Sequence, residues 1–225
     1  MSSAAPNPTS SAVHRRRRWR RRWVIVALLL AIFAAYVCIP RKAHLRHFDP
    51  NAVAKLETTM RRYYEHRRSA LALSLYEMSR NQYGFSPLDS VRLANSAADA
   101  AIVFKDSTND DQADLALPAL RKYFQIMRDR GDCQFDVDEA ARLELTWWKL
   151  RRHNVGPVEY GHAVARATAC IYGISPESID SYAQLRAAAM DLRDRHNASM
   201  TESDWQTIES MLRKSSSDLH QHVAG

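Results

Sequence analysis

The stretch HRRRRWRRRWVIVALLLAIFAAYVCIPRK, residues 14–42, constrains this chain most, because a dense run of arginines directly precedes a long apolar run. Seven of eight consecutive residues are arginine, namely Arg15, Arg16, Arg17, Arg18, Arg20, Arg21 and Arg22. The next 17 residues, 23–39, carry no charge. A helix of that length would span about 25 Å at ~1.5 Å per residue, slightly less than a hydrocarbon core of about 30 Å.

The composition of 23–39 favours membrane insertion. Ten of its residues are Val, Ile, Leu or Phe, and at roughly −0.3 to −0.6 kcal/mol each they favour insertion by about 3–6 kcal/mol. The long side chains of Arg22 and Arg41 can reach outward at the two ends and make up the missing length. Further interfacial side chains lie near the ends, at Trp19, Trp23, Tyr36 and Lys42. The sequence therefore predicts a single transmembrane helix over 23–39.

The charges around this segment predict its orientation. Seven arginines precede it, whereas only Arg41, Lys42 and Arg46 follow it closely. The positive-inside rule then keeps the N-terminus in the cytoplasm and exports the rest of the chain. Residues 1–22 begin with a Ser-, Ala- and Pro-rich stretch that has no hydrophobic pattern, so we expect a disordered, basic cytoplasmic tail.

Three alternatives to a permanent anchor remain open. A cleaved signal peptide needs a small-x-small site, and Val37 is too large for its last position. A lipoprotein would be modified at Cys38, but bulky residues precede that cysteine. Arginine interleaved with tryptophan also suits nucleic acids, but anionic lipid headgroups lie nearer to a patch that is pinned to the bilayer. The anchor is favoured, with a lipid bilayer and no nucleic acid as partner.

The rest of the chain is charge-balanced. Outside the arginine run, 25 basic residues face 25 acidic ones, so residues 40–225 show no overall basic surface of the kind that binds nucleic acids. Basic residues are 26 Arg and 6 Lys, a bias typical of GC-rich bacterial genomes. We therefore expect a bacterial inner-membrane protein whose C-terminal domain lies in the periplasm.

The pattern beyond the anchor predicts an all-α fold. Asp49-Pro50 and Ser86-Pro87 are typical of helix starts, no segment alternates as a strand would, and four of the six glycines fall at the expected joints. We expect a juxtamembrane linker over 40–48 and a helical domain over 49–225. Its bundle or array of about seven helices is expected over 49–82, from 86, over 110–129 with Pro118 dividing it, over 136–152, 156–173 and 175–195, and from 201 onward.

A few charged residues interrupt apolar helix stripes. Arg67 or Arg68, Glu144 and Arg186 are each flanked by apolar residues at helical spacing. A charge inside a core is costly unless it is paired and hydrogen-bonded. The first hypothesis is therefore that Glu144 forms a buried ion pair with one of these arginines. The alternative is a pocket in which an arginine binds an anionic group and the carboxylate has a perturbed pKa.

Recognisable catalytic and metal motifs are absent from the sequence. It contains no glycine-rich phosphate loop, no H-E-x-x-H and no C-x-x-C, so no cofactor and no metal is expected. For His44 and His47, just beyond the anchor, we expect headgroup contact or solvation. Cys133 and Cys170 would both be exported, and an oxidising compartment would permit a disulfide between them.

These observations favour a membrane-anchored interaction or scaffolding module of the cell envelope, with a protein partner there and no catalysis. One alternative is an envelope hydrolase that uses carboxylates from separate helices, such as Glu65 and Glu144. Another is an accessory subunit of a larger membrane complex. Tethering favours the first interpretation because it raises the effective concentration of the domain toward other envelope proteins.

Overall fold

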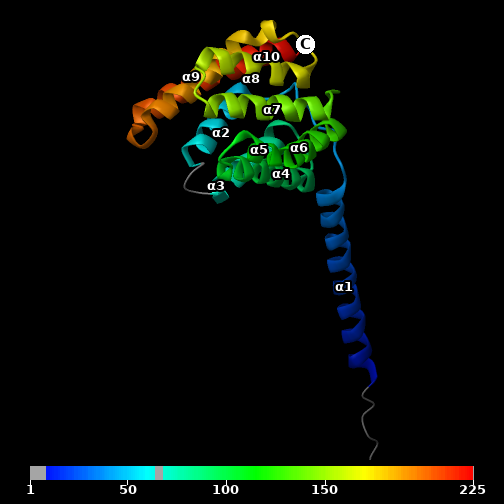
Figure 1. The fold of residues 1–225 in the computed structure, drawn as a ribbon. Helices are drawn as coiled ribbons and strands as arrows, with labels where there is room; N and C mark the ends of the chain where they lie inside the picture. The colour runs from blue at the N-terminus through cyan, green and yellow to red at the C-terminus, as the bar shows by residue number, and fades with distance from the viewer. Residues whose placement is uncertain (1–8, 64–67, 225) are drawn as a thin grey trace, which may run out of the picture. The chain divides into compact units, whose positions relative to one another are not determined.

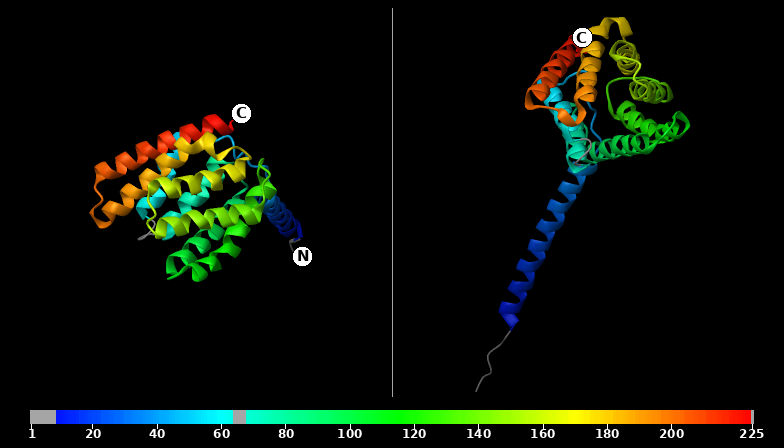
Figure 2. Two further views of the ribbon diagram at one scale, coloured as in Figure 1. Left: turned by 45° about the horizontal axis from the view of Figure 1, so that its top comes forward. Right: turned by 60° about the vertical axis from the view of Figure 1, so that its left-hand side comes forward.

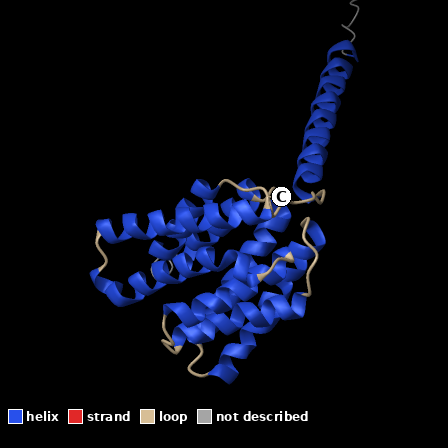
Figure 3. Ribbon diagram, turned by 90° about the horizontal axis from the view of Figure 1, so that it is seen from above, coloured by secondary structure: helices blue, strands red, loops and turns tan. Residues whose placement is uncertain are grey.

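A computed structural model of the chain describes residues 9–63 and 68–224, in which every regular element is a helix (Figures 1 and 3). The predicted all-α fold is confirmed for these residues. The chain divides into two compact units, Met1–Ile39 and Pro40–Gly225. The boundary lies at the end of the apolar run, and the second unit begins nine residues earlier than the helical domain that the sequence predicted.

The first unit contains one helix, α1 (Thr9–Cys38). It includes residues 9–22 of the segment expected to be disordered, because arginine is a good helix former and here continues an apolar helix. Its large apolar side chains are exposed, from 44% at Val26 to 67% at Val24. Within the described part of the chain, no helix combines the length and apolar character needed to cross a membrane. The transmembrane helix over 23–39 therefore stays a prediction.

The second unit contains nine α-helices in its described residues, where the sequence predicted about seven. Their bounds are α2 (Pro50–Tyr63), α3 (Arg68–Glu77), α4 (Pro87–Asp106), α5 (Asp110–Ala113), α6 (Leu117–Arg130), α7 (Val137–Arg152), α8 (Pro157–Tyr172), α9 (Asp180–His196) and α10 (Glu202–Val223). Four short elements accompany them: the π-helix η1 (Met78–Gln82) and the 3-10 helices η2 (Asp114–Ala116), η3 (Pro176–Ile179) and η4 (Asn197–Ser199).

The extra helices have local causes. Over 49–82 the structure has α2, α3 and η1 in place of one helix, with residues 64–67 outside the described part. Pro118 divides the helix expected over 110–129, as predicted, because proline cannot donate the hydrogen bond of a helix interior. Pro176 begins the 3-10 turn η3, so the expected sixth helix starts only at Asp180.

The capping signals read from the sequence are present. Ser86 accepts a hydrogen bond from the backbone N–H of Asp89. Thr201 and Asp204 form a capping box at the start of α10. Gly173 ends α8 in the left-handed conformation, with φ of 64°. These caps satisfy N–H and C=O groups that a helix leaves unpaired at its ends.

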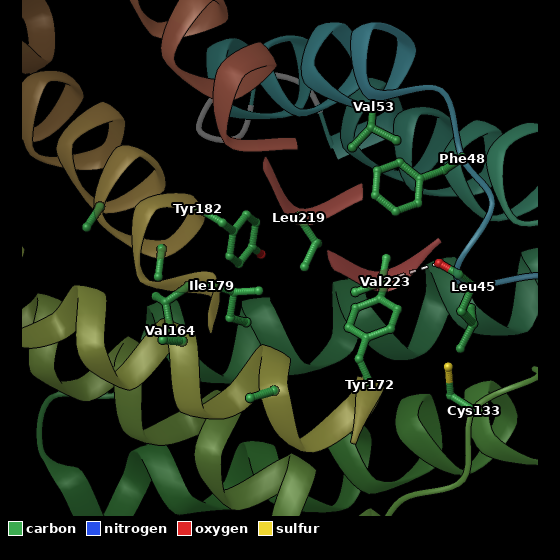
Figure 4. Packing of buried hydrophobic residues seen from close by; sticks show 14 of the residues in the cluster. Leu45, Phe48, Val53, Cys133, Val164, Tyr172, Ile179, Tyr182, Leu219 and Val223 are labelled. Atoms are coloured by element: carbon green, nitrogen blue, oxygen red, sulfur yellow. Dashed lines mark hydrogen bonds between the residues drawn. The ribbon is translucent and has the colours of Figure 1, made fainter. Parts of the chain in front are cut away.

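The helices of the second unit pack in chain order. Each long helix contacts the next one along the chain, and α10 in turn packs against α2 as well as α9 (Figures 1 and 2). The first and last helices of the unit are therefore neighbours. The largest buried cluster lies among these helices, and Figure 4 shows part of it, including Phe48, Val53, Tyr172, Leu219 and Val223.

Residues 43–48, which we name the strap, belong to this core. They fall within the predicted linker 40–48, but Ala43, Leu45 and Phe48 are only 0%, 1% and 7% exposed. Three backbone N–H groups of the strap donate to residues of other segments: Ala43 to the carbonyl of Arg130 (2.6 Å), His44 to that of Tyr83 (2.9 Å) and Leu45 to Asp132 Oδ1 (2.8 Å). The chain is thus fixed within the helical unit from Ala43 onward.

Arg46 holds the strap against two helix ends. Its guanidinium donates to the carbonyl of Tyr172, the last residue of α8, at 2.7 Å and to that of Val223, the last residue of α10, at 3.3 Å. The Tyr172 hydroxyl donates back to the carbonyl of Leu45 at 3.1 Å (Figure 4). A cation at a helix C-terminus is favourable because unpaired carbonyls give that end a partial negative charge. Arg46 is therefore a structural residue rather than a free membrane-flanking cation.

Candidate functional site

The most strongly charged part of the interior is a group of three residues, which we call the Glu57 cluster: Glu57, Arg61 and Arg186. Glu57 on α2 is buried, with a side chain 8% exposed. Its carboxylate accepts a hydrogen bond from Arg61 Nη2, one turn later, at 3.1 Å. Arg186 Nη1 on α9 donates to the other carboxylate oxygen. Two guanidinium groups thus share one buried carboxylate and link α2 to α9.

The electrostatics of the cluster follow from burial and charge. Burial by itself raises the pKa of Glu57, but the adjacent Arg186 and Arg61 charges outweigh it and hold that pKa below its ordinary value. Burial also lowers the pKa of Arg61 to about 10, although Glu57 opposes the shift. Burial acts in the same direction on Arg186, but Glu57 dominates and raises its pKa. The carboxylate therefore stays ionised and is what makes two buried arginines tolerable.

Among the described residues, one polar atom of the cluster has no hydrogen-bond partner. Arg61 Nε is buried and makes no hydrogen bond within that part of the chain, while Arg61 Nη1 lies against the sulfur of Met190. Two cations and one anion leave this cluster with an excess of one positive charge. The excess makes the interior sensitive to any further loss of negative charge.

The structure gives Arg186 a different partner from the one hypothesised. Its carboxylate partner is Glu57 and not Glu144, which lies on α7. The charge of Arg186 opposes the rise in the pKa of Glu144 that burial causes, but it does not reverse that rise. Arg67 lies outside the described residues, and Arg68 begins α3 with a side chain that also lies outside them. A pair between Glu144 and either of these arginines stays a prediction.

Glu144 is half-buried and is held by tryptophan rather than by a cation. Trp148 Nε1, one turn later, donates to Glu144 Oε1 at 3.0 Å. Burial raises the pKa of Glu144, while the hydrogen bonds of Trp147 and Trp148 and the charge of Arg186 only partly oppose it. Trp148 packs its ring edge against Phe104, with centroids 5.2 Å apart. The site thus combines a perturbed carboxyl group with aromatic packing, and among the described residues no second carboxylate contacts Glu144.

The residues that the sequence predicted at the membrane interface lie on α1 and at the start of the second unit. Arg22 is exposed, and Trp19 and Trp23 are 61% and 62% exposed, with an edge-to-face contact at 6.2 Å. Tyr36 is 47% exposed. In the second unit, Arg41 is half-buried and Lys42 is exposed. The other arginines are on α1, but their side chains lie outside the described part: Arg15, Arg16, Arg17, Arg18, Arg20 and Arg21.

Two surface cavities lie at the start of the second unit. The first, of about 420 Å³, is lined by the strap and by the end of η1, namely by His44, His47, Asn81, Gln82, Tyr83 and Gly84. The second, of about 440 Å³, is lined by residues of α2, α3 and η1. Asn81 and Gln82 line both. Neither cavity is lined by Glu144 or by the Glu57 cluster, so the charged interior does not open into them.

Potential metal ligands and thiols are dispersed. Among the described residues, no three His, Cys, Asp or Glu side chains gather so as to hold a metal ion. The disulfide that the sequence left open is not formed, because Cys133 and Cys170 are both free thiols. Cys133 is buried and Cys170 is half-buried. Burial raises the pKa of both thiols.

Comparison with known proteins gives no relative: no family model, no curated protein and no solved structure matches this chain. The functional interpretation therefore depends on the residues themselves. Two members of the Glu57 cluster, Glu57 and Arg61, were not among the site residues that the sequence predicted. A signal was present, because Glu57 lies four residues after buried Val53 and four before Arg61, on the apolar side of α2.

Proposed function

We propose that this protein is an interaction module that α1 anchors in a lipid bilayer. One observation carries the proposal: apart from half-buried Val37, the large apolar side chains of residues 23–39 are exposed, several of them by about 60%. Contiguous exposed apolar surface of this kind marks a membrane or protein contact. The arginine run before it adds attraction to anionic headgroups at roughly 1 kcal/mol per cation near the surface.

The length of the apolar run bears on how it would insert. Its 17 residues are fewer than the ~20 of a typical spanning helix. Insertion across the bilayer then depends on Arg22 and Arg41, whose aliphatic stems extend the apolar length while their charges reach the interface. In this arrangement residues 1–22 stay in the cytoplasm and the helical unit lies on the opposite side, in the periplasm of a bacterial cell.

The interior of the helical unit supports an interaction role better than catalysis. The charges of the Glu57 cluster are committed to one another, because Glu57 pairs with both Arg61 and Arg186. Glu144 is bound by Trp148 and borders neither surface cavity. A hydrolase would instead need two carboxyl groups facing a shared cleft. Glu65, the other carboxylate considered for that role, lies outside the described residues. The module would bind a protein of the cell envelope.

The anchor is tested by placing a charge in the middle of the apolar run. Leu29→Arg in the full chain, expressed in bacteria, should move the protein from the alkali-resistant membrane fraction to the soluble fraction, because one central arginine costs about 2.5–3.5 kcal/mol on insertion scales. Leu115→Arg is the matched control, since Leu115 is also exposed, by 68%, but lies in the helical unit. Unchanged membrane retention of Leu29→Arg would overturn the anchor.

Topology and partner need separate measurements. Alkaline phosphatase fused behind Gly225 through a flexible linker should be active, whereas a green fluorescent protein in the same place should not fluoresce after export. The reverse pattern would place the helical unit in the cytosol. Crosslinking in intact cells, with Leu29→Arg as the comparison, should capture an envelope protein that the variant loses.

A further inference from the structure

The cavity lined by His44 and His47 combines features that point to a ligand. The two imidazole rings belong to the strap and stand edge to face, 6.2 Å apart. Their side chains are exposed, that of His44 by 63%. Asn81 and Gln82 contribute amide groups from the opposite wall. Imidazole and amide N–H groups are hydrogen-bond donors, so the cavity presents several donors in a volume of about 420 Å³.

The wall that carries Asn81 and Gln82 is the π-helix η1, Met78–Gln82. π-Helical turns are rare and occur frequently at functional sites, because the wider turn redirects side chains. Gly84, just beyond it, has a φ of 77°, which bends the chain back toward the strap. The side-chain amide oxygen of Gln82, Oε1, accepts a hydrogen bond from the backbone N–H of Asp49 at 3.2 Å. This bond fixes the wall of the cavity to the residue that follows the strap.

The charges around the cavity are compatible with an anion. Lys42 is exposed two residues before His44. Two acidic residues lie near the cavity. Asp132 Oδ2 is 3.7 Å from His44 Nδ1, and Asp49 donates its backbone N–H to Oε1 of the lining residue Gln82. However, the other oxygen of Asp132 already accepts the Leu45 backbone N–H at 2.8 Å. Its carboxylate thus holds the strap in place and orients the His44 ring.

Chain connectivity limits how far this cavity can be from a membrane. Only Pro40, Arg41 and Lys42 separate Ile39, the last residue of the apolar run, from Ala43, which is fully buried in the helical unit. The four residue-to-residue steps from Ile39 to Ala43 span at most about 14 Å at ~3.3–3.6 Å each. The headgroup layer is itself roughly 5–8 Å thick on each side of the hydrocarbon core. His44 follows Ala43 directly, so a membrane-anchored α1 keeps the cavity beside the headgroups.

We propose that this cavity binds the phosphate group of an anionic phospholipid in the membrane that anchors α1. The imidazoles of His44 and His47 and the amides of Asn81 and Gln82 donate hydrogen bonds to the phosphate oxygens, and Lys42 adds a nearby positive charge. This proposal rests on the proposed anchor, and it adds a specific lipid contact that orients the helical unit on the bilayer surface. It does not require any covalent step.

The test uses the full chain in lipid nanodiscs of phosphatidylcholine, with or without phosphatidylglycerol. Amide hydrogen exchange is followed in residues 78–84. Because a ligand slows local opening by the factor 1 + [L]/Kd, exchange should be about tenfold slower when phosphatidylglycerol is present at ten times its Kd. The double variant His44→Gln/His47→Gln should lose this protection, since glutamine keeps a polar side chain but not the imidazole geometry.

The matched control is His153→Gln/His162→Gln. These histidines are exposed to a similar degree, 54% and 56%, and each also lies near an aspartate, but neither lines the cavity. The control should keep the full protection by phosphatidylglycerol. Equal loss in both double variants would show nonspecific attraction of histidines to the bilayer and would overturn the proposed site.

The remaining outcomes separate the site from the anchor and the lipid from a soluble ligand. A chain that enters the nanodiscs but shows the same exchange with and without phosphatidylglycerol overturns the site and leaves the anchor intact. A chain that does not enter the discs overturns the anchor, and with it the lipid site. Free glycerol phosphate, added to discs of phosphatidylcholine alone, should give no protection; full protection would assign the cavity to a soluble phosphate ester instead.

Discussion

The guanidinium of Arg186 on α9 donates to the carboxylate of Glu57 on α2, which joins residues 129 positions apart in the chain. Arg61 approaches the same carboxylate from one turn along α2. Because α10 packs against both α2 and α9, this pairing lies where the beginning and the end of the helical unit meet. One acidic side chain therefore pairs with two cations at this junction and leaves one positive charge in excess.

Replacing Glu57 by alanine should be strongly destabilising. Glu57→Ala leaves both guanidinium groups buried without a partner, and breaking a buried pair in this way typically costs about 3–5 kcal/mol of unfolding free energy. Urea unfolding of the full chain in mild detergent measures the loss. Glu209→Ala is the control, because its pair with Arg213 on α10 is exposed and should contribute only about 0.3–0.5 kcal/mol. A Glu57→Ala loss no larger than that of the control would contradict the role of the cluster.

Glu144 should make stability depend on pH with a defined sign. Its pKa in the folded chain is raised above the ordinary 4.5, mainly by burial. The folded state then holds the proton more tightly than the unfolded state, so the stabilisation is complete below pH 4.5 and is lost as the pH rises through the folded pKa. Glu144→Gln cannot ionise, so the stability of the natural chain relative to this variant should fall as the pH rises from 4 to 8. A relative gain with rising pH would show that the carboxylate is stabilised instead.

Arg46 should be needed to hold the strap. Arg46→Ala removes two charge-assisted hydrogen bonds to the carbonyls of Tyr172 and Val223, each worth about 1.5–3 kcal/mol. Hydrogen exchange should accelerate at the C-terminal ends of α8 and α10. Arg46→Lys should recover only part of the loss, because one ammonium group cannot reproduce the fork of a guanidinium. Lys42→Ala, an exposed neighbour, should leave exchange at both helix ends unchanged.

The two thiols of the helical unit should differ in accessibility. Cys133 is 1% exposed and Cys170 is half-buried, and burial raises the pKa of both. Since the thiolate is the reactive form, a disulfide reagent at pH 7 should modify Cys170 slowly and Cys133 only on unfolding. Mass spectrometry of the modified peptides, with Cys133→Ser as reference, measures the order in which the two cysteines react. Faster labelling of Cys133 would show that the strap opens readily.

Local signals in the sequence were enough for the fold class but not for the partners of the buried charges. Proline, serine and threonine caps predicted where helices begin, because those residues act within one turn of their own position. Arg186 was singled out as a charge in an apolar stripe, and in the structure it pairs with Glu57. The partner of Arg186 could not be predicted, because Glu57 approaches it only when α2 and α9 pack together. Several other acidic residues on the predicted helices could equally have paired with it.

The strap is a second feature that could not be predicted from the sequence alone. Residues 40–48 contain three basic residues, two histidines and a proline, a composition typical of a solvated linker. The buried residues Ala43, Leu45 and Phe48 are interspersed with exposed His44 and His47 and half-buried Arg46. Their spacing of two and then three residues does not repeat with the period of a strand, so this six-residue stretch gave no reason to expect burial. The surface that this segment covers forms only when the ends of α6, α8 and α10 come together with Tyr83 and Asp132.

The position of Arg46 also determines where an epitope or affinity tag can be added without being buried. By binding the carbonyl of Val223 it fixes the end of α10 beside the place where the chain enters the helical unit. An epitope or affinity label fused behind α10 would follow directly on this fixed helix end. The exposed turn η4, at the other end of 22-residue α10, lies about 33 Å away at ~1.5 Å per residue (Figure 1). Insertions there should stay accessible to antibodies and resins.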